Sequence, residues 1–387
     1  MRRFDLRSAA PLLLTLAVTL GATLWPEHGR PYAVTWCIAC GERGMADAMR
    51  NVLLFIPLGF FVSPRVRHAA VAVAACAALS LAVEAAQQWI PGRDPSAGDL
   101  LLNTAGAALG MGLARSRRVW LHPSPRAAAW LAAGWAALLW AVFVGTGRLL
   151  APVPPRVVTP GPSTGALMRE LFAGRMTLDG VATHGVRGPV ALAALPGGGG
   201  DFLGLRSEGD DLVLWVHTRA AAIELDRPDV RWRGALRGTA MGPVPVSLGR
   251  RGGGWCIRAG PRRNCGVGPT AGSGWGMIVY PDALARRFGA WIDAAWVMAL
   301  FAPFGLWIGR RGWVLGGMAM GFAALAVLPL AGVLAPTPPL LWLGAIGGMA
   351  FAAAARRFLV PNRRHGEAAE RKRSGEPLLP ASPVFPR

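Results

Sequence analysis

Eight apolar segments, most of them close to the length of a membrane-spanning helix, constrain the fold of this chain more than any other feature. A helix needs ~20 residues to cross the hydrocarbon core of a bilayer. The shortest segment, residues 99–114, approaches that length only if its polar start is part of the helix. The sequence therefore predicts a polytopic all-α membrane bundle of about eight transmembrane helices. The segments lie near residues 9–26, 46–63, 69–90, 99–114, 127–147, 291–309, 313–333 and 338–355.

The composition agrees with a membrane protein, because 53% of the residues are hydrophobic and only 16% are charged. A formal net charge of +20 would favour a nucleic-acid partner in a soluble protein. Here the arginines lie at the ends of the apolar segments, so we expect membrane lipids and no nucleic acid as partners. The positive-inside rule then assigns both termini to the cytoplasm. The cytoplasmic arginines would be Arg2, Arg3, Arg7, Arg65, Arg67, Arg115, Arg117, Arg118, Arg126, Arg310 and Arg311, against Arg30, Arg43, Arg50 and Arg93 in the external loops.

The first apolar segment has two interpretations. Because "MRR" precedes it, it could be a cleaved signal peptide. No clear small-residue cleavage site follows, which favours a helix that is retained in the mature protein. The rest of the topology is the same in both cases.

The region between the fifth and sixth segments is too polar to span a membrane. Strand-length runs such as "DFLGLRS", "DLVLWVHT", "AAIELD" and "WGMIVY" alternate with turn signals such as "PGGGGD" and "EGDD". The sequence therefore predicts an inserted extracytoplasmic β-rich, sandwich-like domain. The expected domains are 1–150 (five helices), 151–287 (β-rich), 288–357 (three helices) and 358–387 (a basic, disordered cytoplasmic tail).

Two cysteine pairs fall in regions predicted to be external. Cys256 and Cys265 flank a short loop, and an oxidising compartment favours a disulfide between them. Cys37 and Cys40 form a C-x-x-C pair, for which a structural disulfide is favoured over zinc or redox chemistry because no second pair and no βαβ context accompany it. Cys76 is expected to be a buried thiol. No metal or cofactor is implied.

A weak internal repeat links the two halves of the membrane part. "LLFIPLGFF" from Leu53 resembles "ALFAPFGLW" from Ala299, and "LLNTAGAALGMGLARS" from Leu101 resembles "LLWLGAIGGMAFAAAARR" from Leu340. The pattern predicts one degenerate helical unit used twice, with the β-rich domain between the copies. Four polar residues of the first copy, Asn51, Glu84, Gln87 and Asn103, have apolar counterparts in the second, near Trp296, Leu330, Val333 and Trp342, which suggests a site in one copy only.

Polar and small residues interrupt the second, third and fourth segments near their predicted external ends. A carboxylate inside a membrane costs a few kcal/mol unless it is paired, protonated or facing water, so such residues often mark function. A polar clamp between helices is the alternative, since interhelical hydrogen bonds contribute ~0.6–2 kcal/mol each. The polar residues are Asp47, Asn51, Glu84, Gln87, Asp99 and Asn103, with Arg93 as the nearest cation and with Gly106 and Gly110 at packing positions.

These residues carry a resemblance to a known family. "DAMRNVLLFIPLGF" and "VEAAQQWIPGRDPSAGDLLLNTAGAALG" resemble the VanZ-like family of bacterial membrane proteins over about residues 46–114. The family takes its name from a protein associated with resistance to the glycopeptide teicoplanin. The resemblance implies a location in the bacterial inner membrane and a role at the cell envelope. It also implies that the polar residues named above are the functional positions.

Three functions follow as hypotheses. In the first, the polar set binds or modifies an amphipathic envelope molecule, such as a lipid-linked glycan or cell-wall precursor. Glu84, Arg93 and Asp99 would then be the catalytic candidates, and Asp47, Asn51, Gln87 and Asn103 the ligand-binding candidates. In the second, the chain is a non-catalytic scaffold whose β-rich domain recognises a glycan or a protein. A transporter is less favoured, because the polar groups lie near one surface and in one half.

Overall fold

A computed structural model describes most of the 387-residue chain. The described residues are 6–26, 36, 44–93, 95–152, 162–183, 188–197, 200–226, 228–239, 242–251, 254–279, 282–308 and 313–359.

Each of the eight apolar segments contains a helix. Among the described residues, five helices are long and apolar enough to cross a membrane, and two shorter apolar helices accompany them. The chain is therefore a multi-pass membrane protein, while a count of eight spans stays a prediction. The helices are α1 (Leu6–Leu24), α2 (Gly44–Val62), α3 (Ala69–Gln87), α4 (Ala97–Arg115), α6 (Pro125–Leu149), α9 (Asp282–Trp307), α10 (Trp313–Leu330) and α11 (Pro339–Leu359).

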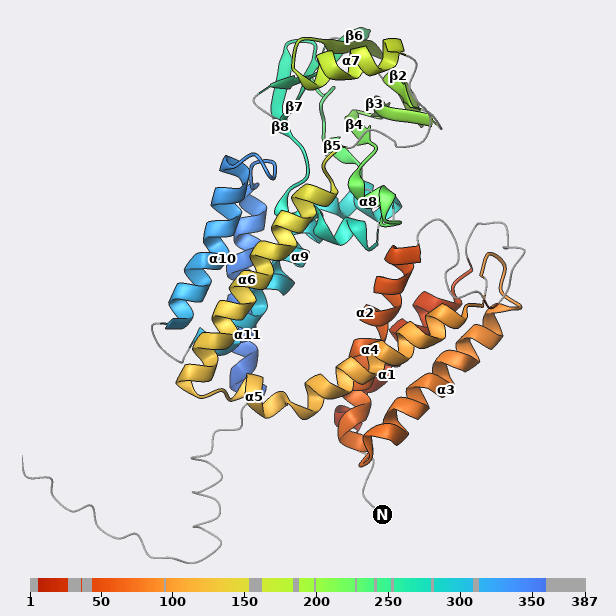
Figure 1. Cartoon of the computed structure of the whole chain (residues 1–387), viewed down its shortest axis with the longest axis vertical. Helices are drawn as coiled ribbons and strands as arrows, with labels where there is room; N and C mark the ends of the chain where they lie inside the picture. The colour runs from red at the N-terminus through yellow and green to blue at the C-terminus, as the bar shows by residue number, and fades with distance from the viewer. Residues whose placement is uncertain are drawn as a thin grey trace, which may run out of the picture.

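The helices form two groups, which we call the first unit (α1 to α4) and the second unit (α6, α9, α10 and α11) (Figure 1). Buried side chains of α6, including Leu139 and Phe143, share one hydrophobic core with Phe301 and Phe304 of α9. This grouping differs from the predicted division at residue 150 into five helices and three. The fifth predicted span follows the first four in sequence, but its apolar face packs on the helices beyond the β-rich domain.

The short helix α5 (Arg117–Leu121) joins the two units at the end farthest from the β-rich domain (Figure 1). The Trp120 ring lies 6.3 Å from that of Phe60 in α2. The Trp120 carbonyl accepts a hydrogen bond of 2.8 Å from Trp307 Nε1 in α9. One aromatic residue therefore contacts both units.

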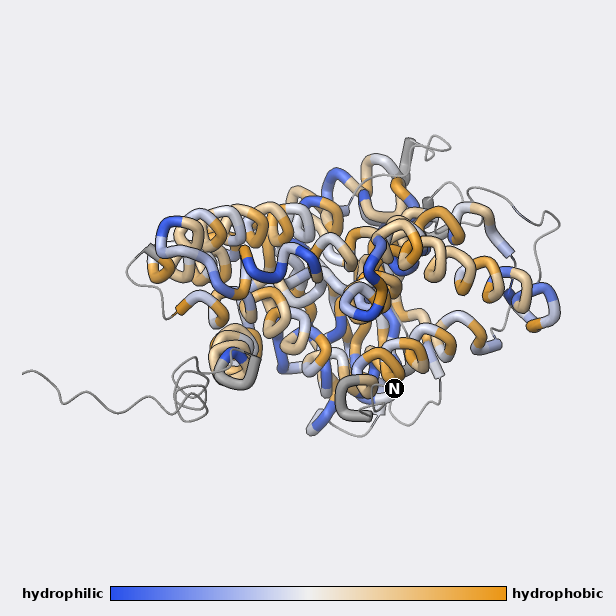
Figure 2. Tube along the Cα trace, turned by 90° about the horizontal axis from the view of Figure 1, so that it is seen from below, coloured by the Kyte–Doolittle hydropathy of each residue, from blue (hydrophilic) through white to orange (hydrophobic). Residues whose placement is uncertain are grey.

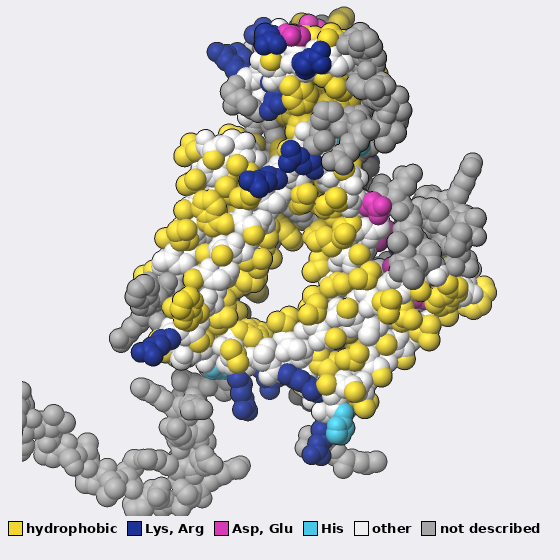
Figure 3. Space-filling model, in the orientation of Figure 1, with side chains coloured by type: hydrophobic (Ala, Val, Ile, Leu, Met, Phe, Trp, Pro, Cys, Tyr) yellow, Lys and Arg dark blue, Asp and Glu magenta, His cyan; other side chains and the backbone are white. Residues whose placement is uncertain are grey.

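Apolar side chains cover both units on the outside. Leu14, Leu101, Trp130 and Leu343 are each more than half exposed, as expected of side chains that face lipid. The traced helices are mainly hydrophobic in Figure 2. In the space-filling view, arginines gather at the ends of the helices away from the β-rich domain (Figure 3).

The region between α6 and α9 contains two four-stranded antiparallel sheets, as predicted for a β-rich insertion. The first has the order β1-β6-β7-β8 and the second β2-β3-β4-β5, and side chains from both form one hydrophobic core. Helix α7 (Pro162–Phe172) packs against this core. The strands are β1 (Thr177–Thr183), β2 (Pro189–Gly197), β3 (Gly200–Glu208), β4 (Asp211–Val216), β5 (Val230–Trp232), β6 (Pro243–Arg251), β7 (Gly254–Ala259) and β8 (Arg262–Val267).

Two of the four runs predicted as strands are not strands. "AAIELD" forms the end of helix α8 (Arg219–Ala222) and a turn in which Glu224 has a positive φ of 59°. The first three residues of "WGMIVY", Trp275 to Met277, end the 3-10 helix η2 (Ala271–Met277), which begins with a capping box between Thr270 and Ser273, and the last residue, Tyr280, lies outside the described residues. In both cases backbone hydrogen bonds between residues three apart at a helix end, Ile223 N–H to the Ala220 carbonyl and Ile278 N–H to the Trp275 carbonyl, take the backbone out of the extended conformation.

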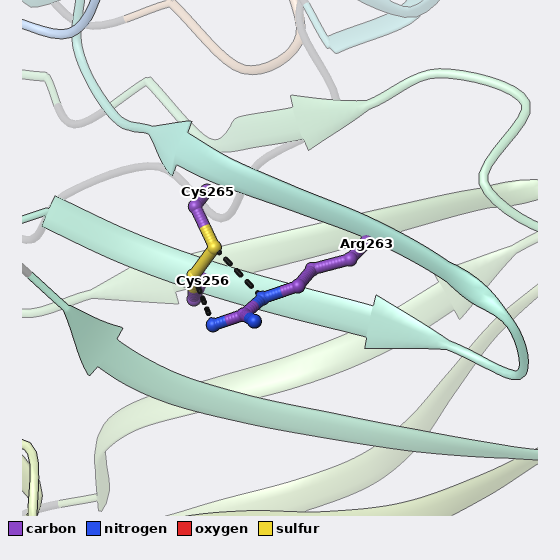
Figure 4. The surroundings of a disulfide bond; sticks show 3 residues. All are labelled: Cys256, Arg263 and Cys265. Carbon is purple, nitrogen blue, oxygen red and sulfur yellow. Dashed lines mark hydrogen bonds between the residues drawn. A yellow bond between two sulfur atoms is a disulfide. The ribbon is translucent and has the colours of Figure 1, made fainter.

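The predicted disulfide between Cys256 and Cys265 is present. It joins directly paired positions of β7 and β8, with the Arg263 guanidinium against the two sulfur atoms (Figure 4). Cys76 is a free, buried thiol as expected. The predicted pair Cys37 and Cys40 lies outside the described residues.

Candidate functional site

The last residue of α3 and the loop between α3 and α4 form hydrogen bonds to the end of α1. This contact lies at the end of the first unit nearest the β-rich domain. Arg93 donates hydrogen bonds to the carbonyls of Trp25 (3.0 Å) and Ala22 (2.9 Å). Gln87 Nε2 donates to the Thr23 carbonyl at 3.0 Å. The last carbonyls of a helix have no intrahelical partner, so these two side chains satisfy groups that α1 leaves open.

Glu84 holds the start of α4. The carboxylate is almost completely buried, at 1% exposure, and its Oε2 accepts a hydrogen bond of 2.8 Å from the Ser96 backbone N–H. Ser96 is the N-cap of α4, and its hydroxyl accepts from the Asp99 N–H at 3.2 Å. Glu84 is thus built into the junction between α3 and α4.

Asp99 is the meeting point of the polar residues that the sequence singled out. The groups that act on its carboxylate are the side chains of Asn51 and Ser96 and the charges of Asp47 and Arg93. Arg93 and Asp99 are in turn the charged groups that act on Glu84. The structure therefore brings Asp47, Asn51, Glu84, Arg93 and Asp99 together, although they come from α2, α3, α4 and a loop. We call these five residues the polar cluster.

Asn103 lies one turn further along α4 and links it to α3. Its Nδ2 donates to Ser80 Oγ at 3.0 Å in a fully buried position. Its Oδ1 is buried and has no hydrogen-bond partner within the described part of the chain. A buried amide oxygen of this kind can still accept a hydrogen bond from a water or a ligand.

Gly106 and Gly110 let α2 and α4 approach backbone to backbone. A Cβ at Gly106 would stand 2.3 Å from the Val52 carbonyl oxygen, and one at Gly110 would stand 1.9 Å from that of Ile56. Gly59 makes the reciprocal approach to Ala107, at 2.0 Å. This small-residue contact fixes the helices that carry the polar cluster, as predicted for both glycines.

An ion bridge that the sequence reading missed joins the polar cluster to the β-rich region. Arg50 pairs with Asp47 at 2.7 Å and with the buried Asp226 at 2.9 Å. Its Nε also donates to the Ile278 carbonyl at 2.6 Å. The spacing of Asp47 and Arg50, three residues apart on α2, is a sequence signal for a same-face pair, but the partner Asp226 is 176 residues away.

The second unit repeats the close helix contact and keeps one carboxylate. A Cβ at Gly305 of α9 would stand 2.0 Å from the Met349 carbonyl oxygen, and one at Gly348 would stand 2.1 Å from that of Met298. Asp293 lies twelve residues before Gly305, just as Asp47 lies twelve residues before Gly59. Asp293 accepts a hydrogen bond of 2.6 Å from Trp275 Nε1 of η2. The expectation of purely apolar counterparts therefore overlooked Asp293.

Exposure divides the predicted site residues into two groups. Glu84, Gln87 and Asn103 are buried and bonded to neighbouring helices, an arrangement that positions the helices. Asp47, Asn51 and Asp99 are partly exposed at the end of the unit nearest the β-rich domain. Carboxylates and amides in such positions can accept hydrogen bonds from, or donate them to, the hydroxyl groups of a ligand.

Three tryptophans of the β-rich region, Trp215, Trp232 and Trp255, have rings that contact other groups of the protein. Arg206 lies over Trp215 and Arg262 over Trp232, each at 5.7 Å from the ring centroid. Trp255 is buried in the core of the two sheets. A guanidinium group or the packed core therefore lies against each of these three rings.

The comparisons with known proteins concern mainly the first unit. No curated protein and no solved structure matches the chain at a significant level. The VanZ/LLP1 family model matches residues 13–120, which include most of α1 and reach into α5, with every polar residue of the predicted site inside the match. Residues 13–120 of this membrane protein are therefore a VanZ-like segment.

Proposed function

We propose that the chain binds an amphipathic cell-envelope molecule, such as a lipid-linked glycan or a cell-wall precursor, at the external face of the bacterial inner membrane. The observation that carries this proposal is the polar cluster, which the fold assembles at the end of the membrane unit nearest the β-rich region. Its partly exposed members, Asp47, Asn51 and Asp99, suit the hydroxyl groups of a sugar. The apolar surface next to them suits a lipid tail.

In this proposal the cluster binds rather than reacts. The Glu84 carboxylate is engaged by the Ser96 N–H, and Arg93 donates to two carbonyls of α1. Both groups support the geometry of the cluster, while a catalytic role of Glu84, Arg93 or Asp99 stays a prediction. A link to glycopeptide resistance belongs to the same proposal and rests only on the family that the segment resembles.

The second candidate is a non-catalytic scaffold in which the β-rich region recognises the ligand. The bridge from Arg50 to Asp226 supports a version in which both parts act together, because it fixes the β-rich region above the cluster. Sugar stacking on Trp215 and Trp232 is disfavoured, because an arginine guanidinium already lies over each of these rings. We therefore propose joint recognition, with the polar cluster as the membrane-side part of the site.

The test is to extract the full chain from bacterial membranes in polymer nanodiscs and to identify the accompanying lipids by mass spectrometry. We expect one class of amphipathic envelope lipid to be enriched over the bulk membrane. The variant Asn51→Ala with Asp99→Asn should reduce this enrichment at least about fivefold, since it removes two polar contacts of ~1 kcal/mol each. A matched control is Thr104→Ala on α4, because the Thr104 hydroxyl bonds within the described residues only to the Leu100 carbonyl of its own helix.

Thermal unfolding of each variant must be measured in parallel, so that lost binding is separated from lost folding. If the wild-type chain carries only bulk lipid, the proposed function is wrong. If Asn51→Ala with Asp99→Asn keeps both its stability and its lipid, the ligand does not use the polar cluster.

A further inference from the structure

A cavity of about 750 Å³ lies where the β-rich region meets the second unit. Its walls come from β4 to β8 on one side, and from the adjoining ends of α6 and α9 and the α10–α11 connection on the other. This volume is within the range of ~300–1,000 Å³ that is usual for small-molecule sites. Sequence reasoning did not find it, because its lining comes from segments spread over most of the second half of the chain.

The lining is strongly basic, with six arginines and two aspartates. Both aspartates are engaged within the protein, Asp229 by Arg206 and Asp293 by Trp275. The arginines that line the cavity are Arg148, Arg219, Arg231, Arg233, Arg250 and Arg251.

Three of these arginines already have partners. Arg231 pairs with Glu208 at 2.6 Å and with Asp211 at 3.2 Å. Burial raises the pKa of Glu208, but the hydrogen bonds and charges of Arg231 and Arg206 outweigh it and hold that pKa below its ordinary value. Arg233 donates to two backbone carbonyls of α9, and Arg250 lies over the rings of Phe172 and Trp255.

The other three arginines are exposed at the cavity. Arg148, Arg219 and Arg251 make no side-chain hydrogen bond or ion pair with the described part of the protein. Arg148 lies in the last turn of α6, where a cation also suits the helix dipole. Arg219 is the first residue of the short helix α8, and Arg251 is the last residue of β6. A helix dipole therefore does not explain either of these two cations.

The expected topology makes these charges more informative. The positive-inside rule concentrates arginines at the cytoplasmic ends of spans. These three lie at the opposite end, beside the β-rich region. A membrane protein gains no topological advantage from them there, so they need another explanation, and recognition of an anion is a direct one.

A buried hydroxyl points to a ligand independently of charge. Thr218, at 6% exposure, lines the cavity, and its Oγ1 has no hydrogen-bond partner within the described residues. A buried polar atom is costly when left unsatisfied. A phosphate oxygen in the cavity would accept a hydrogen bond from this hydroxyl.

The membrane side of the cavity is apolar. Leu150, Ala290, Val333 and Leu334 lie there, at the ends of α6 and α9 and in the α10–α11 connection. An anionic group among the arginines could thus continue into an apolar chain at the membrane surface. We infer that this cavity binds the phosphate-bearing headgroup of an amphipathic lipid, with Arg148, Arg219, Arg251 and Thr218 as its contacts. The cavity shares no lining residue with the polar cluster, so the inference adds a second contact site for the same class of molecule and rests on the proposed function.

The test measures binding of radiolabelled dioleoyl phosphatidic acid to the purified full chain in neutral detergent. Dioleoylglycerol, which has the same tails and no phosphate, and inorganic pyrophosphate, which has no tail, serve as competitors. The variant is the triple change Arg148→Gln, Arg219→Gln and Arg251→Gln. Its matched control is Arg117→Gln, Arg118→Gln and Arg126→Gln, which removes the same charge from exposed arginines at the other end of the helices.

We expect the cavity variant to weaken binding at least about tenfold and the control to change it less than about twofold, because charge-assisted hydrogen bonds to phosphate depend on position. Thr218→Val should weaken binding about threefold while the unliganded protein unfolds at the same or a higher temperature. If Thr218→Val instead lowered both the affinity and the unfolding temperature, the cause would be a packing defect, and the result would count against the hydroxyl contact.

Three results would overturn the inference. The cavity variant could bind as tightly as the control, dioleoylglycerol could compete as well as unlabelled phosphatidic acid, or pyrophosphate could compete equally well, which would indicate a site for soluble anions. The proposed function has a separate failure, namely that no envelope lipid accompanies the wild-type chain from the membrane. Enrichment of a lipid without phosphate would leave the proposed function standing and remove only the cavity assignment.

Discussion

Individual polar residues in the VanZ-like segment each have a structural task that explains their presence in apolar helices. Glu84 and Arg93 bond to backbone groups at helix ends, and Asn103 bonds across to Ser80. The sequence identified these residues from the cost of burying them. It could not assign partners, because a backbone N–H or carbonyl leaves no mark in the sequence. The polar clamp between helices, which the sequence offered as the alternative to a binding site, therefore describes the buried members, while the partly exposed members are the ones that the proposed binding would use.

The first prediction concerns the glycines beneath the cluster. Gly106→Ala would place a Cβ 2.3 Å from the Val52 carbonyl oxygen, so α2 and α4 would have to separate. Overpacking of this kind typically costs ~1–3 kcal/mol. We expect thermal unfolding of the full chain in nanodiscs to occur several degrees lower.

Gly112→Ala in the same helix is the control. No atom lies within 4 Å of a Cβ built there, so the substitution should keep or slightly raise stability through its better helix propensity. If the two alanine variants unfold at the same temperature, the close approach of α2 and α4 is wrong.

At the level of elements, η2 and the residue after it connect the β-rich region to both helical units. Arg50 of α2 donates to the Ile278 carbonyl, and Asp293 of α9 accepts from Trp275. The carbonyl of Met277 also accepts from the N–H of Asp226, the partner of Arg50. The run "WGMIVY" was predicted as a strand because it is apolar and strand-length. Its glycines and the capping box at Thr270 instead form a compact 3-10 turn, and α2 and α9 both form hydrogen bonds to this region.

The second prediction tests this connection. Arg50→Gln should remove two ion pairs while leaving the α2–α4 contact intact. Amide hydrogen exchange in residues 271–279 should accelerate about tenfold, equivalent to ~1.4 kcal/mol of lost local stability. Exchange in residues 97–115 should stay unchanged, because those amides belong to α4.

Arg219→Gln is the matched control for this experiment. Arg219 also lies near the contact between the β-rich region and the helices. It is exposed and makes no side-chain bond to the described residues. Equal exchange in both variants would mean that Arg50 does not hold η2 in place.

For the whole molecule, the sequence predicted the helices and the β-rich insertion better than it predicted which helices pack together. Apolar length revealed the eight helices of the two units, though not the short helices α5, α7 and α8, and turn spacing revealed a β-rich insertion. The assignment of α6 to the second unit was not predictable, because it depends on contacts between residues more than 150 positions apart, such as the hydrogen bond from Trp135 Nε1 to the Leu300 carbonyl. The recurring glycine contacts at Gly59 and Gly305 support the predicted repeat, which stays a prediction.

The last prediction concerns orientation in the membrane. We expect the β-rich region outside the cytoplasm and α5 on the cytoplasmic side, because arginines crowd the α5 end and the disulfide of β7 and β8 needs an oxidising compartment. Val181 of β1 and Val119 of α5 are exposed reporters, at 57% and 62%. In a background with Cys37, Cys40 and Cys76 changed to alanine, Val181→Cys should react with a membrane-impermeant maleimide in intact spheroplasts. Val119→Cys should react only after permeabilisation. Cys256 and Cys265 should stay unlabelled until reduced, and the opposite labelling order would invert the topology and place the arginine-lined cavity in the cytoplasm.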